Sequence, residues 1–255
     1  MCLLLMAVDE HPGFPLVVAA NRDEFHERPT EPADWWPDRP LLGGRDLRAG
    51  GTWFAVDRLG RFAAVTNVRD PARRLVDPPA SRGELPVRAL ESGADDRTVE
   101  SLRDGMERYD GFNLIFGGAG GVFWLSNRGG TAGRLASGVH GLSNHLVDTP
   151  WPKVTRGRAA LAAQLQRQQL DDPEPFFDLL YDRRTAPDAD LPDTGVGLPL
   201  ERRLSPLFIV GETYGTRCST VLLVSNEGRV TFAERRFDPD GRANGTTVKR
   251  FTPHC

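Results

Sequence analysis

Two short apolar runs at the start of the chain, joined by a turn-forming segment, limit the folds that this sequence can adopt. The runs are Leu3 to Val8 and Leu16 to Ala20, and Pro12-Gly13 lies between them. Runs of this length around proline and glycine are typical of a β-hairpin. Cys2 precedes the first run, and the polar cluster Asn21-Arg22-Asp23-Glu24 follows the second. Because hairpin strands are antiparallel, we expect the thiol and the polar cluster to be neighbours.

The chemistry open to Cys2 depends on removal of Met1. Without Met1, Cys2 carries both a thiol and a free α-amine, whose pKa is ordinarily about 7.7–8.0. A nucleophile and a base on one residue form an N-terminal nucleophile, and Asp23 at the end of the partner strand is placed to orient the amine. The alternative is that Cys2 is a small buried hydrophobic residue, as most cysteines at strand starts are.

Later segments repeat the hairpin pattern and alternate with helices. The periodicity predicts an α+β protein of mostly antiparallel sheets covered by helices, in a single domain over residues 1–255. Strands are expected at 52–57, 62–68, 112–116, 122–125, 138–143, 206–210, 220–225 and 230–236. Helices are expected from Ser81 (with Glu84 in a capping box), at 97–109, 151–169 and 176–181. Loops are expected at 28–45 and 185–199, with a loose tail from 239.

Charge and cysteine content exclude several classes of protein. The 255 residues carry a net charge of −3, which argues against nucleic acid as the main partner. The three cysteines have no spacing typical of disulfide scaffolds or zinc sites, so we expect no metal and a cytoplasmic location. No run is long enough to span a membrane. Nearly all basic residues are arginine, which indicates genomic bias or a preference for anionic ligands.

Three further polar residues stand at predicted strand ends. Asn67 and Asn144 could donate to an oxyanion, and Arg217 follows a turn before a strong strand. Asn at a strand end also commonly stabilises a turn, and an arginine there can be a surface residue. Together with Cys2 and Asp23, these residues form our predicted catalytic set.

The chain resembles the NRDE family, also called the transport and Golgi organisation family. The resemblance rests on blocks that run from residue 1 to about 224: Met1-Cys2-Leu3, Ala20-Asn21-Arg22-Asp23-Glu24-Phe25, Gly51-Thr52-Trp53, Thr66-Asn67-Val68-Arg69, Ser81-Arg82-Gly83, Gly111-Phe112-Asn113-Leu114, Leu142-Ser143-Asn144 and Tyr214-Gly215-Thr216-Arg217. It implies a four-layer αββα sandwich of the N-terminal-nucleophile (Ntn) hydrolase type. It also implies a connection with haem trafficking and with lipid or acyl-CoA handling.

A more distant similarity is to the Ntn acylases that cleave bile-salt and penicillin amides. Those enzymes begin Met-Cys and carry Arg-Asn-x-Asp after the first hairpin. Asn21 and Asp23 match this spacing, but Ala20 stands at the arginine position and Arg22 lies between them. We expect this displacement to move the arginine to the other strand face from the thiol. The positions of Asn67, Asn144 and Arg217 resemble later acylase residues.

Two functions follow as hypotheses. The first is an amide or thioester hydrolase that uses Cys2. The second is a non-catalytic carrier of haem or acyl-CoA, in which Arg22, Arg69 and Arg217 bind propionates or phosphates. Neither requires a cofactor, and haem would be cargo. A purely structural partner protein has no sequence feature in its favour. The residues predicted to contact the small-molecule ligand are Asn21, Arg22, Glu24, Arg69 and Asn113.

Overall fold

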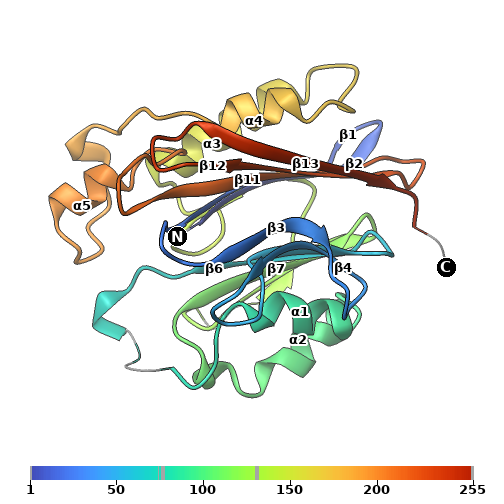
Figure 1. Cartoon of the computed structure of the whole chain (residues 1–255), viewed down its shortest axis with the longest axis horizontal. Helices are drawn as coiled ribbons and strands as arrows, with labels where there is room; N and C mark the ends of the chain where they lie inside the picture. The colour runs from blue at the N-terminus through green and yellow to red at the C-terminus, as the bar shows by residue number, and fades with distance from the viewer. Residues whose placement is uncertain (1, 74, 76–77, 130–131, 254–255) are drawn as a thin grey trace.

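In the part of the chain that the computed structural model describes, two antiparallel β-sheets stack face to face and helices cover both outer faces (Figure 1). The described residues are 2–73, 75, 78–129 and 132–253. This four-layer αββα arrangement confirms the predicted fold class. It follows from amphipathic strands and helices, because a sheet with two apolar faces needs a second sheet on one side and helices on the other.

The first sheet, called sheet A here, contains the opening hairpin. Its strand order is β10-β1-β2-β11-β12-β13, so the N-terminal strand is inside the sheet and not at an edge. The strands are β1 (Cys2–His11), β2 (Phe14–Phe25), β10 (Gly138–Leu142), β11 (Tyr214–Val224), β12 (Val230–Phe237) and β13 (Ala243–Phe251).

The second sheet, sheet B, has the order β3-β4-β5-β6-β7-β8-β9. Its strands follow one another along the chain, as expected for successive hairpins. The strands are β3 (Thr30–Trp35), β4 (Leu41–Asp46), β5 (Phe54–Asp57), β6 (Phe62–Asn67), β7 (Phe112–Gly118), β8 (Gly121–Ser126) and β9 (Ala132–Arg134).

Three buried apolar layers hold these elements together. Alternate residues of β1 and β2, such as Leu4 and Val18, pack between the sheets, whereas Leu5 and Val17 face the helices over sheet A. The third layer lies between sheet B and its helices. Sheet A is covered by α3 (Pro152–Gln164) and α4 (Glu174–Leu180), and sheet B by α1 (Glu84–Glu91) and α2 (Asp96–Arg103); α5 (Leu198–Arg203) follows later in the chain.

Several sequence predictions of elements were wrong for physical reasons that the structure shows. Residues 28–45 are not a loop, because they form β3 and β4. Pro32 is tolerated there because β3 is an edge strand and Pro32 falls at the irregularity between Glu31 and Asp34. The tail from 239 is also not loose, since it forms β13.

Residues 206–210 form no strand. Their apolar side chains are buried, but the backbone of Ile209 bonds to Thr216 across a turn-like contact instead of a ladder.

The helix expected at 97–109 ends at Arg103, and Gly105, at a φ of 88°, precedes a short 3₁₀ turn. The capping box at Ser81 is absent, because the Glu84 carboxylate accepts from the Tyr109 hydroxyl. The helix expected at 151–169 ends at Gln164. Helix α5 was not predicted.

Candidate functional site

Cys2 lies directly opposite Arg22 in the β1–β2 ladder, as the hairpin predicted. The Cys2 side chain is half-buried and packs against the layer between the two sheets. Its thiol forms no disulfide within the described part of the chain, and burial raises the pKa of that thiol. A thiol in this position needs a base to become an effective nucleophile, because the thiolate is the reactive form.

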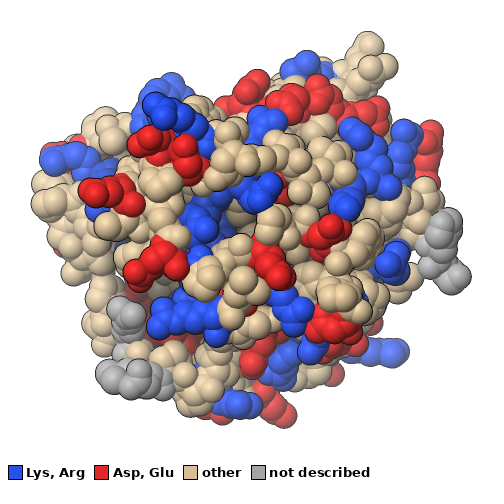
Figure 2. Space-filling model, in the orientation of Figure 1, with Lys and Arg blue, Asp and Glu red and all other residues tan. Residues whose placement is uncertain are grey.

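A pocket of about 130 Å³ opens in front of Cys2 at this end of the two sheets. Figure 2 shows a hollow in the corresponding face of the molecule, near the N-terminus of Figure 1, with basic side chains along its edge. The pocket, called the Cys2 pocket below, is lined by Cys2, Arg22, Asp23, Glu24, Arg28, Asp46, Thr52, Trp53, Val65, Thr66, Asn67, Ser81, Arg82 and Gly83.

Asp23 is held rigidly beside Cys2. Its side chain is 1 % exposed, and Oδ1 accepts a hydrogen bond from Thr216 Oγ1 at 2.6 Å. The Tyr214 hydroxyl donates to the Asp23 backbone oxygen at 3.2 Å. Burial raises the pKa of the Asp23 carboxyl, although the positive charge of Lys153 acts in the opposite direction. Asp23 is therefore a buried acidic group with its orientation fixed by β11.

Lys153 is a charged residue near Asp23 that sequence reasoning missed. It lies in the first turn of α3, is 2 % exposed, and its Nζ has no hydrogen-bond partner among the described residues. Burial lowers the pKa of Lys153 to about 8, and the Asp23 carboxylate opposes this shift. One signal could have identified it: Lys153 is one of only two lysines, and it stands in the apolar start of a helix.

Asn67 and Asn144 meet, as their strand-end positions suggested. Asn144 Nδ2 donates to Asn67 Oδ1 at 2.9 Å, and Ser143 Oγ bonds both to Asn144 Oδ1 and to the Cys2 carbonyl. Asn144 is fully buried, whereas Asn67 lines the Cys2 pocket. Because the Asn67 oxygen accepts from Asn144, its Nδ2 is the group left to donate into the pocket.

Arg22 lies on the same face of β2 as Ala20, which corrects the expectation that it had moved to the other face from the thiol. It is two residues from Ala20, directly opposite Cys2, and only 5 % exposed. Its guanidinium lies 4.3 Å from the Trp53 ring centroid and 3.8 Å from Glu24. The register of β1 and β2 puts the thiol and this arginine in one row on one face of the sheet.

The remaining predicted arginines lie elsewhere. Arg69 forms a buried ion pair with Glu201 at 2.5 Å and lies over the Trp151 ring, lining a different cavity with Lys153. Arg217 donates to the backbone oxygens of Phe25 and Arg28 and is not part of the lining of the Cys2 pocket.

Two predicted ligand contacts, Asn21 and Asn113, have their side chains bonded inside the protein. Asn21 Nδ2 donates to Leu180 and Leu207 on the helix side of sheet A. Asn113 Nδ2 donates to Thr66 and to the His145 carbonyl, which ties sheet B to the segment after β10. Neither lines the Cys2 pocket, whereas Glu24 does.

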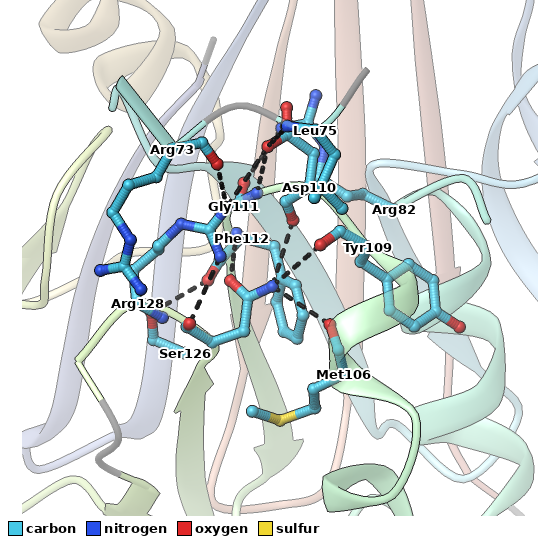
Figure 3. Close-up of polar contacts among 11 residues, drawn as sticks. Arg73, Leu75, Arg82, Met106, Tyr109, Asp110, Gly111, Phe112, Ser126 and Arg128 are labelled. Carbon is cyan, nitrogen blue, oxygen red and sulfur yellow. Dashed lines mark hydrogen bonds and ion pairs between the residues drawn. The ribbon is translucent and has the colours of Figure 1, made fainter. Parts of the chain in front are cut away.

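The segment Ser81-Arg82-Gly83 forms one wall of the pocket. Gly83 lies so close to the connection between β4 and β5 that a Cβ on Gly51 would lie 2.2 Å from the Gly83 oxygen. Arg82 donates to the Gly111 carbonyl at 3.0 Å. Figure 3 shows this arginine beside Asp110 and Gly111 in a polar network that includes Arg128. The network fixes the loop that carries the pocket wall.

Among the described residues, no group of three or more His, Cys, Asp or Glu side chains is placed to hold a metal ion. Among those same residues, no helix has both the length and the apolar character needed to cross a membrane.

Comparison with known proteins identifies related sequences over almost the whole chain. The family model described as Transport and Golgi organisation 2 matches residues 1–239. The mouse protein named Transport and Golgi organization 2 homolog is 31 % identical over 276 residues, which cover 99 % of each chain. The human homolog is 32 % identical over 257 residues, or 92 % of each chain.

Among solved structures, a conjugated bile acid hydrolase from Clostridium perfringens, in a C2A mutant form, superposes with a TM-score of 0.52 at 10 % identity. The match covers 99 % of this chain and 97 % of that one. At this identity the likeness concerns the fold, and it confirms the Ntn-hydrolase-like architecture.

Proposed function

The chain belongs to the transport and Golgi organisation 2 family, and we propose that it is a hydrolase of amide or thioester bonds with Cys2 as its nucleophile. One observation supports this most directly. The Cys2 thiol opens onto a pocket that also contains the buried Asp23 and the Asn67 amide. A nucleophile, an orienting acid and an oxyanion donor are the groups that acyl transfer requires.

The proposed reaction begins once Met1 has been removed. Cys2 Sγ attacks the carbonyl carbon of the substrate, and the thiol proton passes to the α-amine of the same residue. The carbonyl oxygen becomes an oxyanion, which accepts a hydrogen bond from Asn67 Nδ2. Asn144 acts through Asn67 as a positioning residue, because it holds the Asn67 oxygen at 2.9 Å.

The tetrahedral intermediate then collapses. The C–N or C–S bond breaks, the α-ammonium returns its proton to the leaving amine or thiol, and Cys2 is left acylated. A water molecule gives one proton to the amine and attacks the thioester, which releases a carboxylic acid and restores the thiol. Each step conserves protons and needs no oxidant or cofactor.

Asp23 and Lys153 set the electrostatics of the amine. An Asp23 carboxylate would hold the α-amine toward the substrate, and a like charge at Lys153 would disfavour the ammonium form. Lys153 therefore supports the amine in its neutral, basic state. The buried position of both residues makes these interactions stronger than they would be in water.

The alternative function has less support. It is a carrier that binds haem or acyl-CoA through Arg22, Arg69 and Arg217. It needs the three arginines in one site. Arg69 is paired with Glu201 and lines a different cavity from Arg22. We therefore do not adopt it as the primary function.

Intact-mass measurement before and after treatment with an acylating β-lactone tests the proposal. We expect a chain without Met1 and a single acyl adduct on Cys2. Cys2→Ala should lose the adduct and lower hydrolysis of a thioester substrate by at least about a thousandfold. Cys218→Ala, which removes another buried thiol of sheet A, is the matched control and should keep the adduct. Retention of Met1, or hydrolysis unchanged in Cys2→Ala, would refute the mechanism.

A further inference from the structure

A row of paired residues crosses sheet A at the level of Cys2. Cys2 pairs with Arg22, Arg22 with Cys218, Cys218 with Arg236, and Arg236 with Gly245. Paired residues in a sheet share a face, so this row points into the space between the two sheets. Two of its five members are arginines, although most neighbours on this face, such as those of the inter-sheet core, are apolar.

A second pocket, of about 160 Å³, lies along this row and shares Arg22 and Trp53 with the Cys2 pocket. We call it the arginine pocket. It is lined by Arg22, Thr30, Glu31, Pro32, Trp53, Arg217, Cys218, Glu234, Arg236, Phe237 and Asn244.

A β-bulge brings the third arginine into this pocket. Thr216 pairs with Asp23 and Cys218 with Arg22, so Arg217 is an extra residue on β11. Bulges of this kind re-aim a side chain. Arg217 lies near the start of β11 and is partly exposed. Burial lowers the pKa of Arg217, and the positive charge of Arg22 acts in the same direction.

The arginine pocket holds more positive charge than its own acids neutralise. Within the described chain, neither Arg217 nor Arg236 has a carboxylate within ion-pair distance, and Arg22 has only Glu24 at 3.8 Å. Donor atoms are also unused there: Arg22 Nη1, Arg236 Nε and Trp53 Nε1 are buried without a hydrogen-bond partner among the described residues.

The two acids of the pocket do not balance this charge. Glu31 is exposed to solvent. Glu234 is 1 % exposed, and burial raises the pKa of its carboxyl, which favours the neutral form; its Oε1 already accepts the Ala33 N–H at 2.9 Å. Buried donors without partners are costly, and an oxyanion ligand would satisfy several arginine donors at once.

We propose that the arginine pocket binds the anionic end, a carboxylate or phosphate, of the molecule whose carbonyl group lies at Cys2. This inference rests on the proposed function. The anion would lie between Arg22, Arg217 and Arg236, above Cys218, which is two strands from Cys2. Neighbouring strands are about 4.8 Å apart, so the anion and the reacting carbonyl would be separated by roughly 10 Å. The substrate class is an acyl amide or thioester with a negative charge at this distance from its carbonyl.

Binding to the full chain with Cys2→Ala, which cannot turn over, tests the site directly. Two matched pairs of amides serve as probes: suberic monoanilide with octanoic anilide, and N-acetyl-8-aminooctanoate with N-acetyloctylamine. One pair carries the carboxylate on the acyl side and the other on the amine side. Calorimetry should show tighter binding of the carboxylate member in at least one pair, by about tenfold or more. Inorganic phosphate should compete with that binding.

Arg236→Gln should abolish the preference for the carboxylate, while the uncharged members bind as before. Arg250→Gln removes the same charge from an exposed position on the neighbouring strand and should leave the preference intact. Gly245→Ala is a second test that keeps the charge, because its Cβ would lie 2.1 Å from Arg236 Nη2 and displace that guanidinium. Thermal unfolding of each variant checks that the fold is retained.

The outcomes separate the two proposals. Equal binding within both pairs, or a preference that Arg236→Gln leaves unchanged, overturns the anion site. A carboxylate preference that depends on Arg236, in a protein whose Cys2 takes up no acyl adduct and which hydrolyses neither pair nor a thioester, supports the anion site and refutes the hydrolase. Hydrolysis of both members at equal rates and with equal KM supports the hydrolase and counts against the anion site.

Discussion

Replacement of Lys153 by methionine should change how stability depends on pH. Burial lowers the pKa of Lys153 to about 8 from an ordinary value of 10.5. Between these two values the unfolded chain keeps the lysine proton and the native protein has released it. Stability therefore rises with pH across this window, because the unfolded state binds more protons. Below pH 8 both states are charged, and the full cost of burying the ammonium is present.

The size of this effect follows from the shift. A difference of one pKa unit corresponds to about 1.4 kcal/mol, so the window from about 8 to 10.5 gives up to about 3 kcal/mol. The pKa of about 8 already includes the Asp23 carboxylate, which opposes the shift. Methionine has a similar shape but no charge, so the Lys153→Met protein lacks this contribution at every pH.

Urea unfolding at several pH values between 7.5 and 10 measures the difference between wild type and Lys153→Met. Taking the difference removes the contribution of other groups, such as Tyr214 and Cys218, whose pKa values burial raises. Lys249→Met is the control for loss of a lysine, since Lys249 is partly exposed and pairs with Asp34. We expect the free energy of unfolding of wild type minus that of Lys153→Met to rise with pH. If it rises no more than the same difference for Lys249→Met, the reasoning is refuted.

Three further substitutions test individual contacts in and around the site. Asn21→Ala should lower the free energy of unfolding by about 2–3 kcal/mol and leave KM unchanged, because two buried carbonyl groups lose their donor. A higher KM with an unchanged free energy of unfolding would instead show that Asn21 contacts the ligand. Glu201→Gln should cost about 3 kcal/mol in urea unfolding by leaving the Arg69 charge uncompensated, and a cost near zero would contradict the buried pair. Gly51→Ala should cost about 1–3 kcal/mol and slow alkylation of Cys2, since its Cβ would push Gly83 at the pocket wall; unchanged labelling would show that the wall adapts.

Much of the fold could be predicted because the local patterns agree with the global arrangement. The opening hairpin, the hairpin at 52–68 and the one at 112–125 have apolar strands separated by glycine or proline turns, and all three are present. The predictions failed where the composition of a segment is typical of a loop but its neighbours in the fold pair with it as a strand. Proline in β3 is harmless only because that strand is an edge, and the polar residues of β13 form a strand because β12 offers a partner.

Part of the candidate site could be predicted, because its polar residues stand at the ends of predicted strands. Cys2, Asp23 and Asn67 line one pocket, and Asn144 bonds to Asn67. The sequence could not reveal Lys153, because its proximity to Asp23 depends on how α3 packs on sheet A. The face of Arg22, by contrast, was open to prediction, because Arg22 is two residues from Ala20 and the strand period of two places both on one face.

Arg22 and Asp23 are consecutive in β2, yet they serve opposite sides of sheet A. Asp23 faces the helix layer, where Lys153 and Thr216 meet it, and Arg22 faces the space between the sheets beside Cys2. A slip of one residue in β2 would exchange them, placing a carboxylate on the same face as the Cys2 thiol and raising the pKa of that thiol further. The ladder opposes that slip, because β2 is paired on both sides from Leu16 to Arg22 and both of its neighbours lie inside the sheet. The bulge at Arg217 lies at the same level and absorbs the extra residue on β11 without shifting β2.

The site therefore depends on register more than on any single side chain. A one-residue deletion at the bulge should disturb Cys2 reactivity more than removal of the Arg217 guanidinium does, and comparing the alkylation rates of the two variants tests this.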